Sequence, residues 1–367
     1  MPALKQVQTD SDYHKQTALN DIKKLNSQLK ELPGFCRDFF RGIEQTTTTK
    51  TRIGYASDLR TFFRFLFSTN PEFSSDNNEK KIADITLSEL ESLKPVDIEE
   101  YMEYLKYYTY NGKQYSNDER GIHRKIASLK SFYLYYQKRE LISNNPTTVI
   151  DMPKLHDKEI IRLDSDEVAE LLELVENAGE HLTGKKKVYY EKNKLRNIAI
   201  FTLFLGTGIR VSECVGLDMD DVDFKNNGIK IHRKGGAEVV VYFGEEVRSA
   251  LMEYMVERQK ITAADGSVNA LFLSLQNKRI SVRSVEKMVN KYSKLVTSLK
   301  HITPHKLRST YGTSLYRETG DIYLVADVLG HSDVNTTKKH YARLSDDRRR
   351  AASKAVILRE KPDSHNS

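Results

Sequence analysis

Apolar residues recur at helical spacing through the first 141 residues, and this pattern limits the fold of that half more than any other feature. It predicts helices over 13–32, 50–67, 97–110 and 121–141. The inward face predicted for the last of these helices consists of Ile126, Leu129, Phe132, Tyr133 and Tyr136. The first half is therefore predicted to be helical.

The second half mixes helical and strand patterns. A helix is predicted to begin with Asp164 or Ser165 as its cap, and a lysine-rich insert over 184–187 separates it from a buried apolar helix that starts near Arg196. The run Gly206-Thr207-Gly208 breaks that second helix and frees Arg210 from the core. The other predicted elements are strands over 229–232 and 238–242 around the turn Lys234-Gly235-Gly236, a short buried segment over 270–274 and a helix over 282–299.

Composition excludes several classes of protein. The formal charge of +7 makes a polyanionic partner plausible, although it does not by itself establish DNA binding. Cys36 and Cys214 are the only cysteines, too few for a disulfide framework or a cysteine-rich zinc site, which favours the cytoplasm. The polar N-terminus does not resemble a signal peptide, and no apolar run is long enough to cross a membrane. We therefore expect a cytoplasmic protein with no membrane partner.

Polar residues with phosphate-binding chemistry gather in the C-terminal stretch from His301 to Tyr341. His305 and Arg308 follow Pro304, a residue that suits the first turn of a helix. A second helix is predicted to end at Gly330 with a left-handed cap, directly before His331. Arginine presents a fork of donors to phosphate oxygens, histidine transfers protons near neutral pH, and tyrosine can act as a covalent nucleophile.

This stretch resembles the C-terminal signature of the tyrosine site-specific recombinases, the family of Xer recombinases and phage-type integrases. The signature is His-x-x-Arg, then Leu-Gly-His, then a tyrosine about ten residues further on. Upstream, Gly-x-Arg-x-Ser-Glu places Arg210 at the family's first catalytic arginine and Glu213 at a supporting carboxylate, and Lys234 matches the lysine of the family's β-turn. The stretch LPGFCRDFF and the helical N-terminal extension look like the single-recombinase streptococcal type. Tyr341 follows His331 by ten residues, where many relatives have nine.

The resemblance implies a mainly α fold with a small β-sheet, arranged as a two-domain, C-shaped clamp. A helical core-binding domain would contact DNA, and a mixed α/β domain would carry the catalytic residues. The expected parts are an N-terminal helical extension (1–45), the core-binding domain (46–150), a linker (151–164), the catalytic domain (165–345) and a C-terminal tail for subunit exchange (346–367).

The resemblance also implies the role of each candidate catalytic residue. Tyr341 would form a 3′-phosphotyrosyl link and release a 5′-hydroxyl, with Lys234 as the general acid for that leaving group. His305 is suited to accept the tyrosine proton, because an unperturbed phenol has a pKa of about 10. His331 would hydrogen-bond the phosphate. The two arginines, Arg210 and Arg308, would neutralise its nonbridging oxygens, so no metal, nucleotide or other cofactor is expected.

The expected partners are a duplex with an inverted-repeat recombination site, three further copies of this chain in a homotetramer on two duplexes, and a septal DNA translocase. Seven cations are predicted to bind DNA: Lys50, Arg52, Arg60, Arg64, Arg124, Lys125 and Lys130. Resolution of chromosome dimers is the expected role, and integration or excision of a mobile element with the same chemistry is the alternative.

Three other interpretations remain open from the residues. His301 and His305 stand four apart like a metal-binding pair, but Pro304 interrupts the spacing and no acidic third ligand is near. A DNA-binding protein without chemistry would lack one of the six candidate catalytic positions. A type IB topoisomerase shares the tyrosine chemistry, but the two-domain layout disfavours it.

Overall fold

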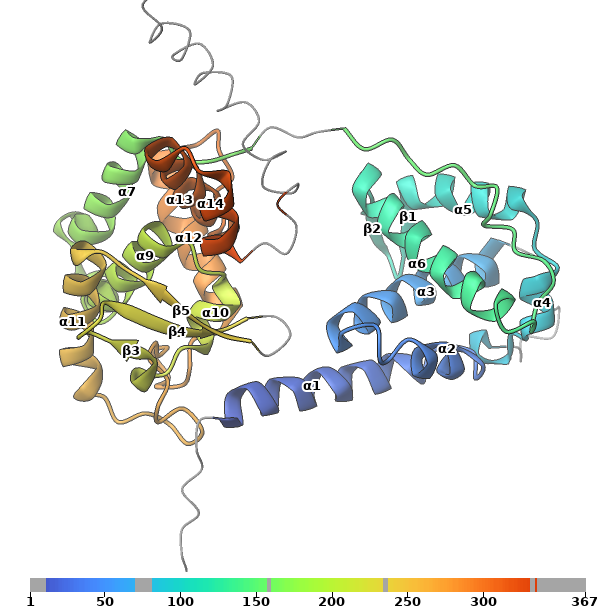
Figure 1. Ribbon diagram of the computed structural model, residues 1–367, viewed down its shortest axis with the longest axis horizontal. Coiled ribbons are helices and arrows are strands. Elements are labelled where there is room, and N and C mark those ends of the chain that lie inside the picture. The colour runs from blue at the N-terminus through green and yellow to red at the C-terminus, as the bar shows by residue number, and fades with distance from the viewer. Residues whose placement is uncertain (1–10, 70–80, 157–159, 234–236, 331–333, 335–367) are drawn as a thin grey trace, which may run out of the picture. The chain divides into compact units, whose positions relative to one another are not determined.

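The computed structural model describes residues 11–69, 81–156, 160–233, 237–330 and 334. The chain divides into two compact units, one of Ser11–Lys158 and one that includes the chain from Glu159 onward (Figure 1). Both units are mainly helical, as predicted, and each contains one small sheet. None of the described helices combines the length and the apolarity that a membrane-spanning segment needs.

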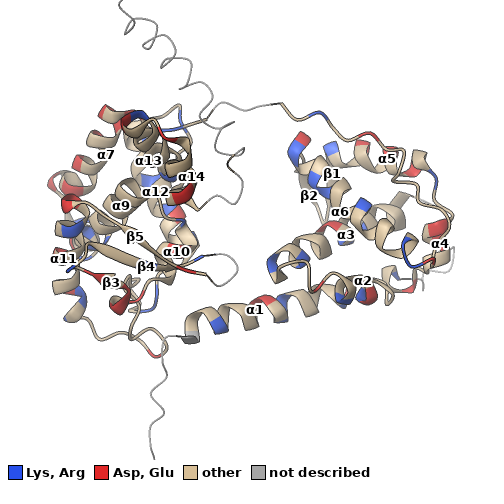
Figure 2. Ribbon diagram, viewed as in Figure 1, with Lys and Arg blue, Asp and Glu red and all other residues tan. Residues whose placement is uncertain are grey.

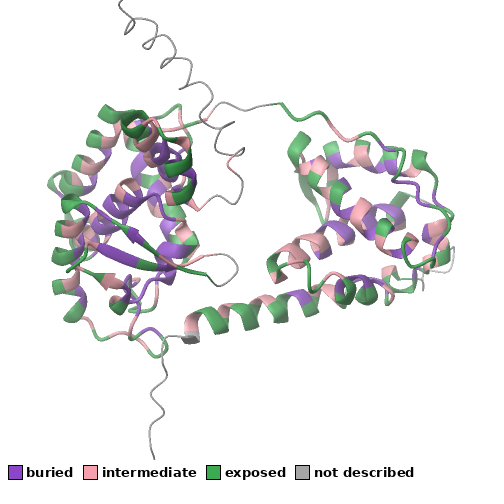
Figure 3. Cartoon of the chain, in the orientation of Figure 1, coloured by how far each residue is buried: buried purple, intermediate pink, exposed green. Residues whose placement is uncertain are grey.

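The first unit is a helical bundle built around α3 and α6. Its elements are α1 (Ser11–Leu29), α2 (Cys36–Gly42), α3 (Thr49–Thr69), a 3₁₀ turn (Ile82–Asp84), α4 (Leu87–Glu91), α5 (Pro95–Lys106), β1 (Tyr107–Tyr110), β2 (Lys113–Ser116) and α6 (Glu119–Gln137). All five residues predicted for the inward face of the helix over 121–141 are buried. They meet Leu59, Phe62 and Phe63 of α3 in one apolar core (Figure 3).

The N-terminal helices belong to this same core. The α3–α6 core buries Leu25 of α1 and three side chains of α2, Cys36, Phe39 and Phe40. The Tyr136 hydroxyl of α6 donates a 2.7 Å hydrogen bond to the carbonyl of Phe35. The extension therefore packs as part of the bundle.

The prediction of one helix over 97–110 is wrong beyond Lys106. Residues Tyr107–Tyr110 pair with Lys113–Ser116 as an antiparallel hairpin. Asn111 and Gly112 form its turn, with φ values of 49° and 70° that match a two-residue hairpin turn. The tyrosine-rich run has the aromatic composition that strands favour, so the helix gives way to the hairpin. Tyr108 stacks on Tyr115 with ring centroids 5.2 Å apart.

The second unit packs helices around a three-stranded antiparallel sheet of order β3-β4-β5. Its elements are α7 (Ser165–Asn177), a 3₁₀ turn (Ala178–His181), α8 (Gly184–Glu191), α9 (Lys194–Thr207), α10 (Val211–Gly216), a 3₁₀ turn (Met219–Asp221), β3 (Val222–Asp223), β4 (Gly228–His232), β5 (Glu238–Tyr242), α11 (Glu245–Gln259), α12 (Val282–Val296), α13 (Pro304–Thr319) and α14 (Ile322–Leu329). The apolar helix α9 packs against α7, α11 and α13.

Most predicted elements of this unit are confirmed, with local corrections. The lysine-rich insert over 184–187 forms the start of α8 rather than a separate spacer, and the helix from Val282 ends at Val296 rather than Leu299. Asp164 is the residue that caps α7, and its backbone N–H donates to Glu167 at 2.8 Å. The predicted segment over 270–274 is buried through Leu273.

The start of the second unit is fastened to α13. The backbone N–H of Leu163 donates to the hydroxyl of Thr310 at 3.0 Å. Lys300, in the loop before α13, donates to Asp164 at 3.1 Å and to Glu167 at 2.5 Å. The first residues of this unit therefore hold the helix that carries two candidate catalytic residues.

Candidate active site

Helix α13 carries His305 and Arg308. Pro304 occupies the first helical position, as predicted, where its missing N–H costs nothing. Arg308 is 5% exposed and donates through Nη1 to the carbonyl of Gly208 at 2.7 Å and through Nη2 to the carbonyl of Leu329. His305 lies one turn earlier and is exposed.

Arg210 stands where α9 gives way to α10. Gly208 ends α9 at φ 63°, a left-handed conformation that glycine adopts readily, and Arg210 is the cap residue of α10. Its Nη1 donates to the buried Glu213 carboxylate at 2.8 Å, and its Nη2 donates to the carbonyl of Gly330 at 3.0 Å. Arg210 and Glu213 thus pair on a helix, and the arginine also reaches a helix far away in the sequence.

Three guanidinium groups converge on the C-terminal end of α14. Arg210, Arg233 and Arg308 all donate to carbonyls of residues 327–330. A helix C-terminus carries about half a negative charge, which partly offsets the mutual repulsion of the three cations. Each guanidinium has five N–H donors, so these bonds leave others for a phosphate. The cations are therefore fixed in place without substrate, which is the condition for efficient electrostatic stabilisation.

The structure brings together two of the six candidate catalytic residues with a third arginine that the sequence did not indicate. Lys234, His331 and Tyr341 lie outside the described residues, and His305 is on the same helix as Arg308. The only sequence signal for Arg233 is its position next to Lys234. Its contacts depend on the tertiary structure, and the spacing of residues in the sequence does not predict them.

Among the described residues, no group of three or more histidine, cysteine or acidic side chains is arranged to hold a metal ion. His301 lies beside the side-chain amide of Asn290, with Nε2 and Nδ2 3.2 Å apart.

Two of the predicted DNA-binding cations on α6 share one buried carboxylate. Arg124 and Lys125 both pair with Asp58 of α3, the lysine at 3.4 Å. Burial raises the pKa of the Asp58 carboxyl, while the two cations act to lower it. Lys130 donates to the carbonyl of Ile150 at 2.7 Å. These contacts fix the directions of the three side chains.

Three of the four predicted cations on α3 contact acids that precede this helix in the chain. Arg60 and Arg64 donate to the Glu31 carboxylate at 3.1 and 3.2 Å, and Arg52 donates to Glu44 at 2.7 Å. Half-exposed ion pairs of this kind contribute about 0–1 kcal/mol each, so phosphates can compete for these arginines.

Figure 2 marks the lysine and arginine positions on the ribbon. Exposure separates the predicted DNA-binding cations into two groups. Lys50 and Arg124 are exposed, and Arg124 keeps 54% of its side chain accessible although it pairs with Asp58. The other five are partly covered. Lys50 and Arg124 are therefore the best placed for direct phosphate contact.

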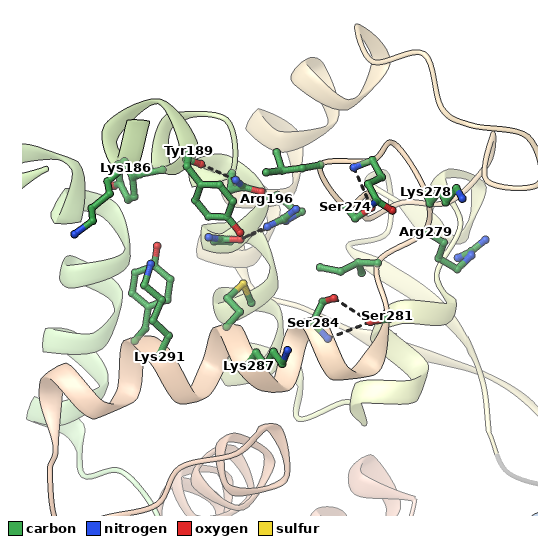
Figure 4. A pocket seen from close by; sticks show the side chains of 18 of the residues that line it. Lys186, Tyr189, Arg196, Ser274, Lys278, Arg279, Ser281, Ser284, Lys287 and Lys291 are labelled. Carbon is green, nitrogen blue, oxygen red and sulfur yellow. Dashed lines mark hydrogen bonds between the residues drawn. The ribbon is translucent and has the colours of Figure 1, made fainter. Parts of the chain in front are cut away.

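A large pocket lies at the other end of α9 from Gly208, between α8, α9, α12 and the segment 274–281 (Figure 4). Its volume is about 1060 Å³, and its described lining contains no acidic residue. Its lining includes the lysines Lys186, Lys287 and Lys291 and the tyrosines Tyr189, Tyr190 and Tyr292. The helix rise places it roughly 18 Å along α9 from the arginine cluster.

The fold and the arginine cluster define a class of protein. The chain belongs to the phage integrase family, whose model matches residues 161–348. It is a tyrosine recombinase, an enzyme that cleaves and rejoins DNA.

Curated relatives extend the similarity over almost the whole chain. Tyrosine recombinase XerC of Caldanaerobacter subterraneus subsp. tengcongensis is 36% identical over 303 residues, which cover 81% of this chain and 79% of the relative. Tyrosine recombinase XerS of Streptococcus uberis is 30% identical over 357 residues, which cover 91% of this chain and 98% of the relative. The chain is thus similar to Xer recombinases along both of its units.

Solved structures share the fold at low sequence identity. XerH recombinase bound to a palindromic difH substrate, in a post-cleavage complex, matches 96% of this chain and 90% of that chain with a TM-score of 0.63 and 19% identity. The Tn1549 transposon integrase in complex with circular intermediate DNA matches 88% and 99% with a TM-score of 0.60 and 22% identity.

Proposed function

We propose that the chain is a site-specific DNA recombinase that works through a 3′-phosphotyrosyl intermediate. The observation that supports this most is the meeting of Arg210 and Arg308 at one helix end. Two fixed guanidinium groups suit the nonbridging oxygens of a phosphate whose charge grows during attack. The proposed substrate is duplex DNA, because the recombinases XerH and Tn1549 integrase share the fold and are bound to DNA in their structures.

In the proposed reaction the Tyr341 oxygen attacks the phosphorus and the bond to the 5′-oxygen breaks. His305 accepts the phenol proton, and the Lys234 ammonium gives a proton to the departing 5′-oxygen. His331 donates a hydrogen bond to the phosphate. The phosphotyrosyl bond retains the energy of the broken link, and a 5′-hydroxyl of the partner strand later attacks it and releases the tyrosine. The arginines supply the charge, so neither metal nor nucleotide is required.

The test is to trap the intermediate on a suicide substrate, a DNA nicked near the cleavage point, in the presence of a chelator and without nucleotide. We expect a covalent adduct after denaturing electrophoresis, and peptide mapping should locate the DNA on Tyr341. Strict dependence on magnesium or zinc, or mapping of the DNA to another residue, would overturn the mechanism.

We propose chromosome-dimer resolution at an inverted-repeat site as the role, in the cytoplasm and with a septal DNA translocase as activating partner. The similarity to XerS and XerC supports it. The alternative is mobile-element integration, since the Tn1549 transposon integrase has the same fold. A recombination assay with the DNA beside the gene distinguishes the two roles. Chromosome-dimer resolution requires recombination between two copies of a short inverted repeat found there. Mobile-element integration requires that the recombined sites are the ends of a mobile element.

We propose that four copies act on two duplexes, linked by the tail 346–367. The tail contains an apolar set, Ala351, Ala352, Ala355, Val356 and Leu358, that lies outside the described residues. A short helix with such a face needs a partner to be stable. Each copy would then bind one half-site. It would do so with the core-binding domain (46–150) and the catalytic domain (165–345), joined by the linker 151–164.

Deleting the residues after Ser345 is expected to leave half-site binding nearly unchanged and to remove cooperative binding to the full site. The reason is that the tail would contact a second subunit rather than DNA. Gel-shift titration on half-site and full-site DNA measures both quantities. Unchanged cooperativity together with normal recombination would show that the tail does not link subunits.

A further inference from the structure

Arg233 is the last described residue before Lys234 and stands at the end of the β4–β5 stem. His232 pairs with Glu238 in the antiparallel register, and the backbone N–H of Arg233 donates to the carbonyl of Ala237 at 2.8 Å. These bonds place the backbone of Arg233 at the end of the β4–β5 stem, directly before Lys234 in the chain. Its side chain does not continue along the sheet.

The Arg233 side chain reaches α14 instead. Nη2 donates to the carbonyl of Val328 at 2.8 Å, and Nη1 contacts the carbonyl of Asp327 at 3.4 Å. The guanidinium lies directly against Gly330, where an added Cβ would be 2.3 Å from Nη1. Gly330 also has φ 60°, so glycine serves two needs at this position. The Arg233 guanidinium therefore fits at this position only because residue 330 has no side chain. We call this position the seat of Arg233.

Arg210 and Arg308 donate to the same end of α14, to the next carbonyls along the chain. The stem that carries Lys234 and the two phosphate-binding candidates are thus fastened to one helix end. Arginine can bridge two neighbouring carbonyls because its donors form a rigid fork, whereas lysine supplies a single point of contact.

We infer that Arg233 is a positioning residue that sets the place of Lys234 relative to Arg210 and Arg308. This inference rests on the proposed function, in which Lys234 protonates the departing 5′-oxygen. Without the Arg233 side chain, the bonds from the β4–β5 stem to the carbonyls of Asp327 and Val328 are lost. Misplacement by about 1 Å of a group in a reacting site can cost about 10²-fold in rate.

The experiment compares ordinary DNA with DNA that has sulfur in place of the 5′-bridging oxygen at the cleaved phosphate. In both cases the bond from phosphorus to the leaving atom breaks and the tyrosine–phosphorus bond forms. A thiolate leaves without taking up a proton, so a defect in the general acid disappears on the sulfur substrate. A defect in folding, DNA binding or charge stabilisation slows both substrates.

Single-turnover rates of adduct formation at saturating protein are measured for Arg233→Met and for Lys234→Ala as the reference. Arg248→Met is the matched control, because Arg248 also donates to a backbone carbonyl, that of Phe224, in the same unit but away from α14. We expect Arg233→Met to be slower by about 10²-fold on ordinary DNA and close to the unchanged protein on sulfur DNA, as Lys234→Ala is. Arg248→Met should show the same ratio of the two rates as the unchanged protein.

A second arm tests the seat at Gly330. Gly330→Ala should show the same recovery on sulfur DNA, and the double variant with Arg233→Met should be no slower than the slower single variant. Equal slowing of Arg233→Met on both substrates, or no slowing on ordinary DNA, overturns the inference. If Lys234→Ala itself stays slow on sulfur DNA, the proposed general acid is wrong and the inference fails with it. Recovery of Lys234→Ala without recovery of Arg233→Met refutes the role of Arg233 alone.

Discussion

Tyr341→Phe is expected to abolish the covalent adduct while the affinity for DNA stays within about twofold, the usual range for a substitution that removes no packing. The change deletes the oxygen proposed as the nucleophile and keeps the aromatic ring. No other group in the proposed site can form the phosphotyrosyl bond. The measurements are trapping on the nicked substrate and a gel shift on intact DNA.

Tyr323→Phe is the matched control, because Tyr323 lies on α14 and is 63% exposed. It removes one phenol oxygen from the same region and should trap DNA at the normal rate. A persistent adduct in Tyr341→Phe would assign the nucleophile to another tyrosine, and the candidates are Tyr311 and Tyr316 on α13 and Tyr323 on α14. Of these, Tyr311 packs closely against Gly208, and burial raises the pKa of its hydroxyl.

Arg308→Lys is expected to slow single-turnover cleavage by about 10³-fold, the scale of losing one preorganised donor to a developing oxyanion. Lysine keeps the charge but cannot reach the carbonyls of Gly208 and Leu329 at once. One buried carbonyl then loses its partner, which costs about 1–3 kcal/mol of folding free energy. Urea unfolding measures that cost separately from the rate.

Arg317→Lys is the control for Arg308→Lys, since Arg317 is an exposed residue in the last turn of the same helix. It should change neither the cleavage rate nor the unfolding midpoint measurably. If Arg308→Lys cleaves at the normal rate although its stability falls, Arg308 holds the two helix ends together without taking part in the chemistry.

Local patterns predicted most of the helices because each helix is encoded by its own spacing and breaks. Gly208, Gly320 and Gly330 end helices in left-handed conformations, and two of these ends were predicted from glycine alone. The hairpin over 107–116 was missed because Tyr107 and Tyr108 continue the apolar spacing of α5. The Asn111-Gly112 pair was the available signal for a turn there.

Long-range pairings could not be predicted from spacing. Glu31 contacts Arg60 and Arg64 from the turn after α1, and Asp58 contacts Arg124 from a position 66 residues away. A count of cations along a helix therefore overstates how many are available to phosphate. The role of Arg233 could not be predicted for the same reason, because its partners are backbone carbonyls at a helix end, which every residue type has.

Helix α14 has only eight residues, and isolated helices shorter than about 12–15 residues are marginal in water. Its buried residues Val325 and Leu329 form a small cluster with neighbours on α13, separate from the main core of the unit. Local opening of such a helix costs less free energy than global unfolding. One opening event would break at once the bonds that all three arginines donate to residues 327–330. The fraction of molecules with a complete cation cluster therefore follows the local folding equilibrium of this one helix rather than three independent side-chain equilibria.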